Sequence, residues 1–457
     1  MADLIASSKL TAVVGLGISG LATARFLARQ GERFILLDTR AEPPLLPQFL
    51  AEFPEQKPVC GPLNIETLTA VDQIILSPGV AKTEPAIAAA EQAGVAVLGD
   101  VDLFVRHAQA PIIAITGSNG KTTVTTLVGG MAAAAGLNIA VGGNIGTPVL
   151  DLLAEPTPDF YVLELSSFQL ETTHNLAALA AVVLNLSRDH MDRYPSYSAY
   201  HAAKMRIFFG VQTMLVNRDD PLTRGPLAAG VKQVSFGLSA PDLKQFGILQ
   251  VGQEAYLAKG TEPLLAVSRL QLRGSHNHSN ALAAMALVDE MGVLNSAALQ
   301  FLAAFPGVAH RCQWVAEKNG VVFINDSKAT NVGATLAALK GLSSDLQGTA
   351  NSQGRIHVIL GGQGKGADFT ELLGGLGERV ATALVLGEDA EKIIAAIKPA
   401  VPVVAVATMQ EAVEQAYALA AAGDLVLLSP ACASFDMFNG YEHRGQVFES
   451  AVEALAA

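Results

Sequence analysis

Short runs of apolar residues recur along the chain, and each run ends in a small or polar residue. The runs are rich in Val, Ile and Leu, and Ala-rich stretches with the composition of helices lie between many of them. Continuous apolar strands that alternate with helices indicate parallel sheets covered on both faces. The pattern therefore predicts an α/β protein. The expected strands are residues 12–15, 34–38, 73–77, 112–116, 161–164, 181–185, 357–361, 383–387 and 425–429.

The runs fall into three groups, which we interpret as three α/β domains. The chain has 457 residues, and a single core is not expected because cores stop growing at about 250–300 residues. We place the domains at residues 1–99, 100–306 and 307–457. Residues 245–272 are expected to form short antiparallel strands within the second domain. The apolar run 176–184 is too short to span a bilayer and should lead into a buried strand.

Composition and charge narrow the classes of function. The formal net charge is -12 and the sequence contains no Lys/Arg cluster, which argues against nucleic acid as a partner. Cys60, Cys312 and Cys432 lie far apart, so neither a disulfide scaffold nor a zinc site is expected and a reducing compartment fits. Residues 1–4 lack the basic and apolar segments of a signal peptide. We expect a cytoplasmic protein with no membrane partner.

A glycine-rich turn predicts a nucleotide site in the first domain. Gly15, Gly17 and Gly20 follow an apolar run and open a helical stretch, and Asp38 ends the next run, where a ribose-binding acid is expected. Glycines let the backbone approach a diphosphate at the start of a helix, where free N–H groups favour negative charge. The turn makes this domain Rossmann-like but leaves the nucleotide open, since by itself it also suits an NAD- or FAD-dependent enzyme.

A second glycine turn indicates ATP more strongly. Residues 116–123 read Thr-Gly-Ser-Asn-Gly-Lys-Thr-Thr, between an apolar run and an Ala-rich stretch. The backbone amides of such a loop cradle phosphates, while Lys121 would reach the β and γ oxygens and Thr122 would face Mg²⁺. Ile115 stands where the strict pattern has its first glycine, but the Gly-Lys-Thr triplet has the expected setting. We therefore expect a P-loop ATPase-like central domain with a parallel sheet, and two different nucleotide sites in one chain.

Acidic and imidazole groups follow the next two expected strands. Glu164 ends one run, and His190 lies just beyond the other. Because parallel strands end at the same edge of a sheet, both side chains should lie near the P-loop. Glu164 would suit a nucleotide-bound Mg²⁺, and His190 a second metal or a phosphate. Lys204, in contrast, has the spacing of a surface lysine in a helix, and nothing in the residues around it singles it out.

Together these motifs resemble the ATP-dependent Mur ligase family, over essentially the whole chain. The resemblance rests on the P-loop and on residues 185–192, 274–281, 310–311 and 325–328. Further segments resemble the branch of the family that adds D-glutamate, namely residues 164–171, 326–331 and 428–436. The Asp-Asn-Pro-Arg motif expected of the branch that adds a diamino acid is absent from the sequence. The resemblance implies a C-terminal Rossmann-like α/β domain that binds the amino acid.

The resemblance also implies a role for particular residues. ATP would be bound by Gly117, Ser118, Asn119, Gly120, Lys121, Thr122, Thr123, Asn277, Arg311 and Asp326. A UDP-linked substrate, in place of NAD, would be bound by Gly17, Ile18, Ser19, Asp38, Thr39, Arg40, Ser77 and Asn144. D-glutamate would be bound by Lys328, Thr330, Lys365, Ser434 and Tyr441. Two Mg²⁺ ions would be held by Thr122, Glu164, His190 and a carbamylated Lys204. The catalytic set would be Lys121, Glu164, His190 and Lys204.

The resemblance implies a reaction that joins UDP-N-acetylmuramoyl-L-alanine to D-glutamate, after ATP has activated the carboxylate as an acyl phosphate. We expect a monomer that serves peptidoglycan synthesis and adopts open and closed forms. Another ligase of the family, of the folate polyglutamate type, is an alternative, although its substrate would lack uridine. An NAD-dependent oxidoreductase would leave the P-loop unexplained. A P-loop module that senses nucleotide without ligation would leave the pattern of the third domain unexplained.

Overall fold

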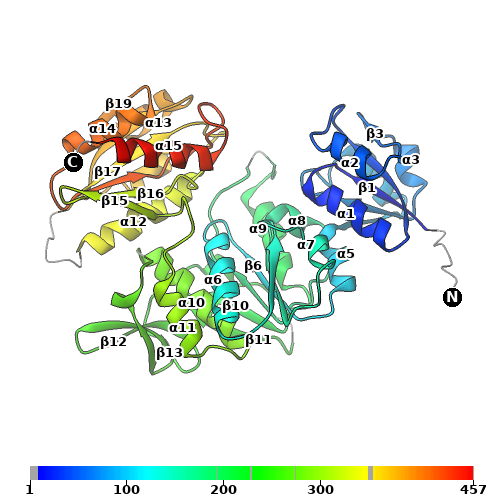
Figure 1. Ribbon diagram of the computed structural model, residues 1–457, viewed down its shortest axis with the longest axis horizontal. Helices are drawn as coiled ribbons and strands as arrows, with labels where there is room; N and C mark the ends of the chain where they lie inside the picture. Colours follow the sequence, from blue (N-terminus) through cyan, green and yellow to red (C-terminus); the bar gives the residue numbers. More distant parts are fainter. Residues whose placement is uncertain (1–8, 192, 227–228, 273, 348–353, 456–457) are drawn as a thin grey trace.

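The computed structural model describes residues 9–191, 193–226, 229–272, 274–347 and 354–455. The expectation about a signal peptide rests on residues 1–4, which lie outside the described residues. Asp192, the last residue of the segment 185–192, also lies outside them. Three separate sheets are each covered by helices (Figure 1). The N-terminal and C-terminal parts flank the central part. The predicted fold class of three α/β domains is thus confirmed.

The N-terminal sheet is parallel throughout, with the strand order β3-β2-β1-β4-β5. In this order the connections run in opposite directions from β1, which opens a crevice beyond the carboxyl ends of β1 and β4. The strands are β1 (Leu10–Val14), β2 (Arg33–Asp38), β3 (Val59–Cys60), β4 (Gln73–Leu76) and β5 (Ala96–Gly99). The helices are α1 (Ile18–Arg29), α2 (Leu46–Glu52), α3 (Ile65–Thr69) and α4 (Pro85–Gln92).

The central sheet has the order β14-β13-β12-β11-β10-β9-β6-β8-β7. It is parallel from β7 to β12 and antiparallel from β12 to β14, so the antiparallel strands expected within residues 245–272 extend one edge. The strands are β6 (Ile112–Thr116), β7 (Ile139–Gly143), β8 (Phe160–Glu164), β9 (Ala180–Val183), β10 (Thr213–Asn217), β11 (Lys232–Phe236), β12 (Phe246–Val251), β13 (Glu254–Lys259) and β14 (Glu262–Ala266). The helices are α5 (Asp100–His107), α6 (Lys121–Ala134), α7 (Val149–Leu152), α8 (Ser167–Glu171), α9 (Tyr197–Met205), α10 (Ser275–Glu290) and α11 (Ser296–Ala304), with short 3₁₀ turns η1 (Arg206–Phe208), η2 (Pro221–Thr223) and η3 (Val267–Arg269).

The C-terminal sheet has the order β15-β16-β20-β17-β18-β19, and only the edge strand β15 runs antiparallel to its neighbour. The strands are β15 (Gln313–Lys318), β16 (Val321–Asn325), β17 (Ile356–Gly361), β18 (Val380–Leu386), β19 (Val403–Ala405) and β20 (Leu425–Leu428). The helices are α12 (Val332–Gln347), α13 (Ala390–Ile397), α14 (Met409–Leu419) and α15 (Tyr441–Ala454), with the 3₁₀ segment η4 (Phe369–Gly374). The carboxyl ends of the parallel strands of this sheet lie along one edge, where ligands bind in such folds.

The apolar strands are buried on both faces, as their sequence pattern predicts. Along β6, Ile113 and Ile115 belong to a cluster with α6 and α10. Ile112 and Ala114 point the other way, into a cluster that continues through Phe104 of α5 to the N-terminal domain. This alternation follows from the two-residue period of a strand. The first two domains therefore share an apolar contact. No helix in the described part of the chain has the length and apolarity that crossing a bilayer requires.

Candidate active site

The loop between β6 and α6 is held in shape by the segment that follows β9. Asn119 N donates to Asn185 Oδ1 at 2.9 Å, and Asn185 Nδ2 donates to Asn119 O at 3.0 Å. Gly120 has a φ of +81°, and a Cβ at this residue would lie 2.5 Å from Asn280 Oδ1 of α10. Glycine is required here by both the backbone conformation and the closeness of α10. The N–H groups at the start of α6 thus face a space suited to an anion.

Lys121 is folded back onto this loop. Its Nζ donates to Gly117 O and to Ser118 O, both at 2.9 Å. Burial lowers the pKa of the Lys121 ammonium, while the nearby carboxylates of Glu164 and Asp189 act in the opposite direction. Its hydrogen bonds run to neutral carbonyl oxygens. A phosphate oxygen would be a stronger partner for the ammonium, because hydrogen bonds between two charged groups are the stronger kind.

Glu164, at the end of β8, connects residues that the sequence assigned to different sites. Its Oε2 accepts a hydrogen bond from Thr122 Oγ1 at 2.8 Å, and its Oε1 accepts one from Asn144 Nδ2 at 2.7 Å. Arg311, from the third domain, donates through Nη2 to Thr122 Oγ1 at 2.6 Å. The fold therefore joins one predicted residue of the UDP-substrate site and two of the ATP site around a single buried carboxylate.

The chemistry of this group suits a nucleotide-bound Mg²⁺. Hydroxyl and carboxylate oxygens are ligands that Mg²⁺ prefers, and the ion commonly takes its other ligands from water and phosphate. Within the described ranges, no three His, Cys, Asp or Glu side chains gather closely enough to hold a metal by themselves. Thr122 and Glu164 fit one ion that is also held by ATP. His190 has a side chain that is 44% exposed, and its ring lies edge-on to Phe168 with the centroids 4.8 Å apart.

Lys204 is buried, so the interpretation of it as a surface lysine is wrong. Only 2% of the residue is exposed, and its Nζ donates to Gly117 O at 2.9 Å and to Thr116 Oγ1 at 3.3 Å. Desolvation lowers the pKa of Lys204 well below its usual range, and repulsion from Lys121 adds to this effect. Its spacing could not show the burial, because lysines on helices are usually exposed and the sequence does not reveal that α9 packs beneath the phosphate loop.

Two cavities border the phosphate loop. The larger, of about 860 Å³, lies between the central and C-terminal domains. Its lining includes Ser118, Asn119, Lys121, Thr122, Asn144, Glu164, His190, Arg311, Lys328, Thr330, Lys365 and Tyr441. The smaller, of about 370 Å³, has a lining that includes Asn119, Gly120, Thr123, Asn277, Arg311 and Asp326. The residues predicted to bind ATP, Gly117 excepted, thus run along these two cavities, and those predicted for D-glutamate, Ser434 excepted, face the larger one.

A third cavity, of about 470 Å³, lies at the carboxyl ends of β1 and β4. The residues predicted to bind the UDP-linked substrate all line it: Gly17, Ile18, Ser19, Asp38, Thr39, Arg40, Ser77 and Asn144. Asn144 also lines the cavity of about 860 Å³. A substrate with its nucleotide in the third cavity could therefore extend past Asn144 toward the phosphate loop.

Asp38 in this third cavity is bound to its own domain. Its carboxylate accepts hydrogen bonds from Leu16 N at 2.6 Å, from Arg40 N at 2.8 Å and from Arg40 Nη2 at 2.7 Å. Burial acts to raise the pKa of Asp38, but the hydrogen bonds from Arg40 and Leu16 hold it below its ordinary value. Ser77 is likewise engaged, since its Oγ donates to Gly15 O at 2.7 Å. In this structure both side chains shape the glycine turn.

The third domain contributes two groups with strongly perturbed acidity. Burial lowers the pKa of Lys328 to about 8, and its Nζ lies 3.6 Å from the centre of the Tyr441 ring. Burial raises the pKa of Asp326 to about 7, although hydrogen bonds from Ser429 Oγ at 2.8 Å and Cys312 N at 3.1 Å favour the carboxylate. Perturbed groups that line a cleft are typical of functional sites.

Two buried residues, Ser434 and Arg444, lie behind the large cavity. Ser434 is buried and is not among the residues that line this cavity in the described part of the chain. Arg444, which no motif in the sequence singles out, is 2% exposed and donates through Nη2 to Ser327 O at 2.7 Å and through Nη1 to Cys432 O at 3.1 Å. Burial lowers the pKa of Arg444 to about 10. Because arginines near a helix start are mostly exposed, no sequence pattern marked it.

Models of three domains match the chain in order. They are the MurD-like N-terminal domain of Mur ligases over residues 9–99, the Mur ligase middle domain over residues 115–288 and the glutamate ligase domain of Mur ligases over residues 310–432. The chain belongs to the Mur ligase family.

Individual curated relatives are similar to this chain over its full length. The chain is 52% identical to the UDP-N-acetylmuramoylalanine–D-glutamate ligase of Hahella chejuensis over 453 residues, which cover 99% of this chain and 100% of that one. It is 51% identical over 454 residues, with the same coverage, to the ligases of the same name from Pseudomonas fluorescens and Pseudomonas aeruginosa.

Solved structures share the fold of this chain at low sequence identity. A pseudomurein peptide ligase type C from Methanothermus fervidus has a TM-score of 0.60 at 18% identity, covering 97% of this chain and 99% of its own. UDP-N-acetylmuramate–alanine ligase from Thermotoga maritima has a TM-score of 0.58 at 19% identity, covering 98% of this chain and 99% of its own. At such identity the likeness concerns the fold alone.

Proposed function

We propose that this chain joins D-glutamate to UDP-N-acetylmuramoyl-L-alanine by an amide bond, with ATP converted to ADP and phosphate, in the synthesis of peptidoglycan precursors. The observation that carries the proposal is the full-length similarity, at about half identity, to relatives that are named for this reaction. The placing of Asn144 between the nucleotide-substrate cavity and the P-loop cavity supports it. We further propose a cytoplasmic monomer whose domains divide after residues 99 and 306.

The first step is phosphoryl transfer to the substrate carboxylate. A carboxylate oxygen attacks the γ-phosphorus, the bond to the β,γ-bridging oxygen breaks, and ADP leaves. Such transfer depends on positioning and on neutralising charge more than on covalent chemistry by the protein. Lys121 would exchange the carbonyl oxygens of Gly117 and Ser118 for phosphate oxygens. Arg311 would add a second positive charge from the third domain, so transfer requires that domain to lie against the loop.

The second step forms the amide. The amino group of D-glutamate attacks the carbonyl carbon of the acyl phosphate, and the tetrahedral intermediate expels phosphate. The ammonium of the amino acid must first lose a proton, and we propose as its acceptor a carboxylate that lines the same cavity, or His190 in a state in which it does not bind the second ion. An acyl phosphate is hydrolysed by water, so closing of the third domain over the cavity would protect it.

Two metal sites are part of the proposal. Thr122 and Glu164 would hold an Mg²⁺ that, when bound, neutralises charge on the transferred phosphoryl group. We assign the second ion to His190 and to a carbamate on Lys204. The burial of Lys204 supports this, because desolvation favours the neutral amine, which is the form that adds to CO₂ with loss of a proton. The resulting carboxylate would offer oxygen ligands that an ammonium cannot.

The amino-acid site would lie on the C-terminal side of the large cavity. D-glutamate carries two carboxylates, and Lys328 and Lys365 would supply the matching positive charges. Thr330 and Tyr441 would add hydrogen bonds, and Ser434 would do so after a shift of its loop turned the hydroxyl toward the cavity. The ammonium of Lys328 lies over the Tyr441 ring, which keeps it directed into the cavity while leaving its donors available.

The test is phosphate release from ATP in the presence of Mg²⁺ and UDP-N-acetylmuramoyl-L-alanine, with D-glutamate, with L-glutamate and with no amino acid. Release only with D-glutamate, together with a mass gain of one glutamate residue on the UDP-linked product, is expected. Equal release with L-glutamate would contradict the selectivity. No release with either isomer, from protein that binds ATP, would contradict the substrate assignment.

A further inference from the structure

Three loops meet behind the proposed amino-acid site. They follow the carboxyl ends of β20, β17 and β18, which are neighbours in the sheet. The first two are joined by a pair of backbone hydrogen bonds, from Gln363 N to Ala433 O and from Ala433 N to Gln363 O, both at 2.9 Å. Ser434 follows this bridge directly, and Lys365 lies two residues beyond it. The positions of these two proposed D-glutamate residues therefore depend on how the loops are held together.

Asp436 ties the third loop to this pair. Its Oδ2 accepts a hydrogen bond at 2.9 Å from Glu388 N, two residues after the end of β18. The packing at this point leaves no room for a side chain, because a Cβ on Gly387 would lie 2.6 Å from Asp436 Oδ2 and 2.7 Å from Gly362 N. Gly387 also has a φ of +90°, which disfavours other residues. The carboxylate of Asp436 thus lies where the backbones of all three loops come closest.

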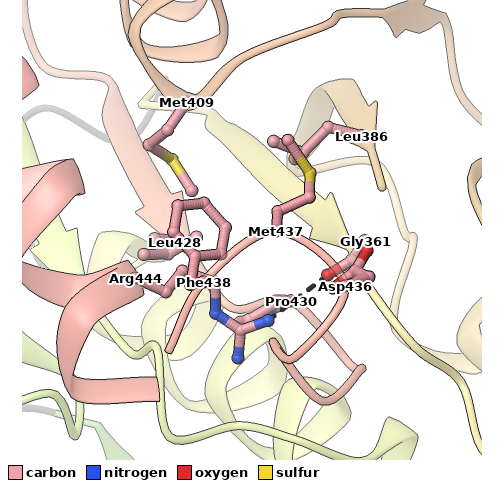
Figure 2. Close-up of a pocket in the computed structure, with 10 residues that line it drawn as sticks. Gly361, Leu386, Met409, Leu428, Pro430, Asp436, Met437, Phe438 and Arg444 are labelled. Carbon is pink, nitrogen blue, oxygen red and sulfur yellow. Dashed lines mark hydrogen bonds between the residues drawn. The ribbon is translucent and has the colours of Figure 1, made fainter. Parts of the chain in front are cut away.

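The other oxygen of Asp436 has no such partner. Oδ1 is buried, and it has no hydrogen-bond partner among the described residues. The Asp436 side chain lines a small space of about 10 Å³ together with Gly361 and Arg444, and apolar side chains such as Phe438 make up much of the remaining lining (Figure 2). The Arg444 guanidinium points toward the same space, and its Nη1 donates to Gly361 O at 3.4 Å. A space of about 10–15 Å³ with two or more polar groups around it can hold one water.

The charges around this space are complementary. Arg444 is buried, and its five hydrogen bonds run to a hydroxyl or to backbone carbonyl oxygens rather than to a carboxylate. Its electrostatic partners include Asp436. A buried cation with only neutral acceptors is stabilised by a nearby carboxylate, and an unpartnered buried carboxylate oxygen is stabilised by a water that it shares with that cation.

We propose that Asp436 is a positioning residue for the amino-acid site, and that one internal water joins its Oδ1 to the Arg444 guanidinium. This proposal rests on the proposed function, because the loops that Asp436 holds carry residues assigned there to D-glutamate. Asp436 acts through these loops and does not itself contact the substrate. Its substitution should therefore weaken the use of D-glutamate while leaving the two nucleotide sites intact.

The experiment compares Asp436→Ala and Asp436→Asn with the unchanged chain and with Glu391→Ala, an exposed acid on α13 of the same domain, as a control. Loss of the hydrogen bond to Glu388 N and of the negative charge in Asp436→Ala should raise the KM for D-glutamate by about tenfold. Asp436→Asn keeps an acceptor and should raise it by about threefold. The KM values for ATP and for the UDP-linked substrate should stay within about twofold of those of the unchanged chain in both variants, as in Glu391→Ala.

Each possible result of this experiment either supports or overturns the proposal. Equal increases in all three KM values, or an unchanged KM for D-glutamate in a folded Asp436→Ala variant, would overturn the proposal. If Asp436→Ala does not fold, Asp436→Asn decides alone, and its unchanged KM for D-glutamate would overturn it. A crystal structure at high resolution should show density for one water between Asp436 and Arg444, and a dry space would overturn that part. If the unchanged chain shows no D-glutamate-dependent release, the proposed function fails and this proposal falls with it.

Discussion

Two turns of the same local design are completed in different ways in this molecule. Each runs from a buried strand through glycines into a helix, from β1 to α1 and from β6 to α6. At the first turn, Asp38 is bound by Leu16 and Arg40 of its own domain. At the second, Thr122 is hydrogen-bonded to Glu164 of β8 and to Arg311 of another domain. A glycine turn thus lets an anion approach the backbone, but the chemistry depends on the charged groups that the rest of the fold delivers.

Replacing the lysine of the second turn should give the largest effect. In Lys121→Ala, the positive charge next to the transferred phosphoryl group is lost, and kcat for phosphate release should fall by about 10³-fold. The affinity for the UDP-linked substrate, measured by calorimetry, should not change, because the first turn is complete within the N-terminal domain. A fall of less than about tenfold, or a parallel loss of affinity for the UDP-linked substrate, would contradict the difference proposed between the two turns.

Lys328 is a residue of the third domain that lines the cavity beside the second turn, and its contribution should be visible in the pH dependence of the KM for D-glutamate. Burial lowers the pKa of Lys328 from 10.5 to about 8, so its ammonium is present below pH 8 and lost above it. The KM for D-glutamate should rise by about tenfold for each pH unit above 8, and the KM for the UDP-linked substrate should not follow it. Between pH 8 and 10.5 the unfolded chain binds more protons at this residue, so this group makes stability rise with pH in that window.

Lys328→Arg is the matched variant for this pH profile. A guanidinium keeps its charge throughout this range, so the dependence of the KM for D-glutamate on pH above 8 should disappear even if its value at pH 7 is altered. Steady-state kinetics across pH 7 to 9.5 with saturating ATP would measure it. An identical profile in the variant and in the unchanged chain would show that Lys328 is not the group that titrates.

Disturbing the first turn should give the smallest effect. Arg40 is half exposed, so its ion pair with Asp38 is screened by water. Arg40→Ala should raise the KM for the UDP-linked substrate by about twofold to fivefold, with kcat unchanged at saturation. Arg33→Ala, an exposed arginine at the start of β2, should have no effect. A loss of kcat in Arg40→Ala would show that the first turn also depends on the catalytic centre.

Much of the fold could be predicted because its signals are local. Continuous apolar runs such as Ile112–Thr116 are buried on both faces of a parallel sheet, and only a covered sheet stabilises such a run. The P-loop was recognisable for the same reason, since residues 117–123 are adjacent in the sequence and in space. The three-domain class followed from the grouping of these runs and is confirmed by the separate sheets.

The candidate site could be predicted only in part from the residues themselves. Lys204 and Arg444 are charged residues on helices, and a sequence predicts both to lie at the surface. Their burial is set by contacts with segments that are far away along the chain, such as Gly117 for Lys204 and Ser327 for Arg444. Only the family resemblance assigns a role to Lys204, because neither the periodicity nor the spacing of the residues around it indicates one. Ser434 lies behind the cavity that it was expected to face, because its loop is folded onto the loop after β17.

The apolar strands, their order and the two glycine turns follow from local sequence, because these features depend on residues within about one helical turn or one strand of each other. Which charged groups complete each turn depends instead on the tertiary structure. Thr122, Glu164 and Arg311 are separated by long stretches of chain, and only the packing of parallel strands and of one domain against another makes them hydrogen-bonded neighbours. Burial then perturbs the acidity of groups such as Lys328, because desolvation is a property of the assembled interior and is not encoded at any single position.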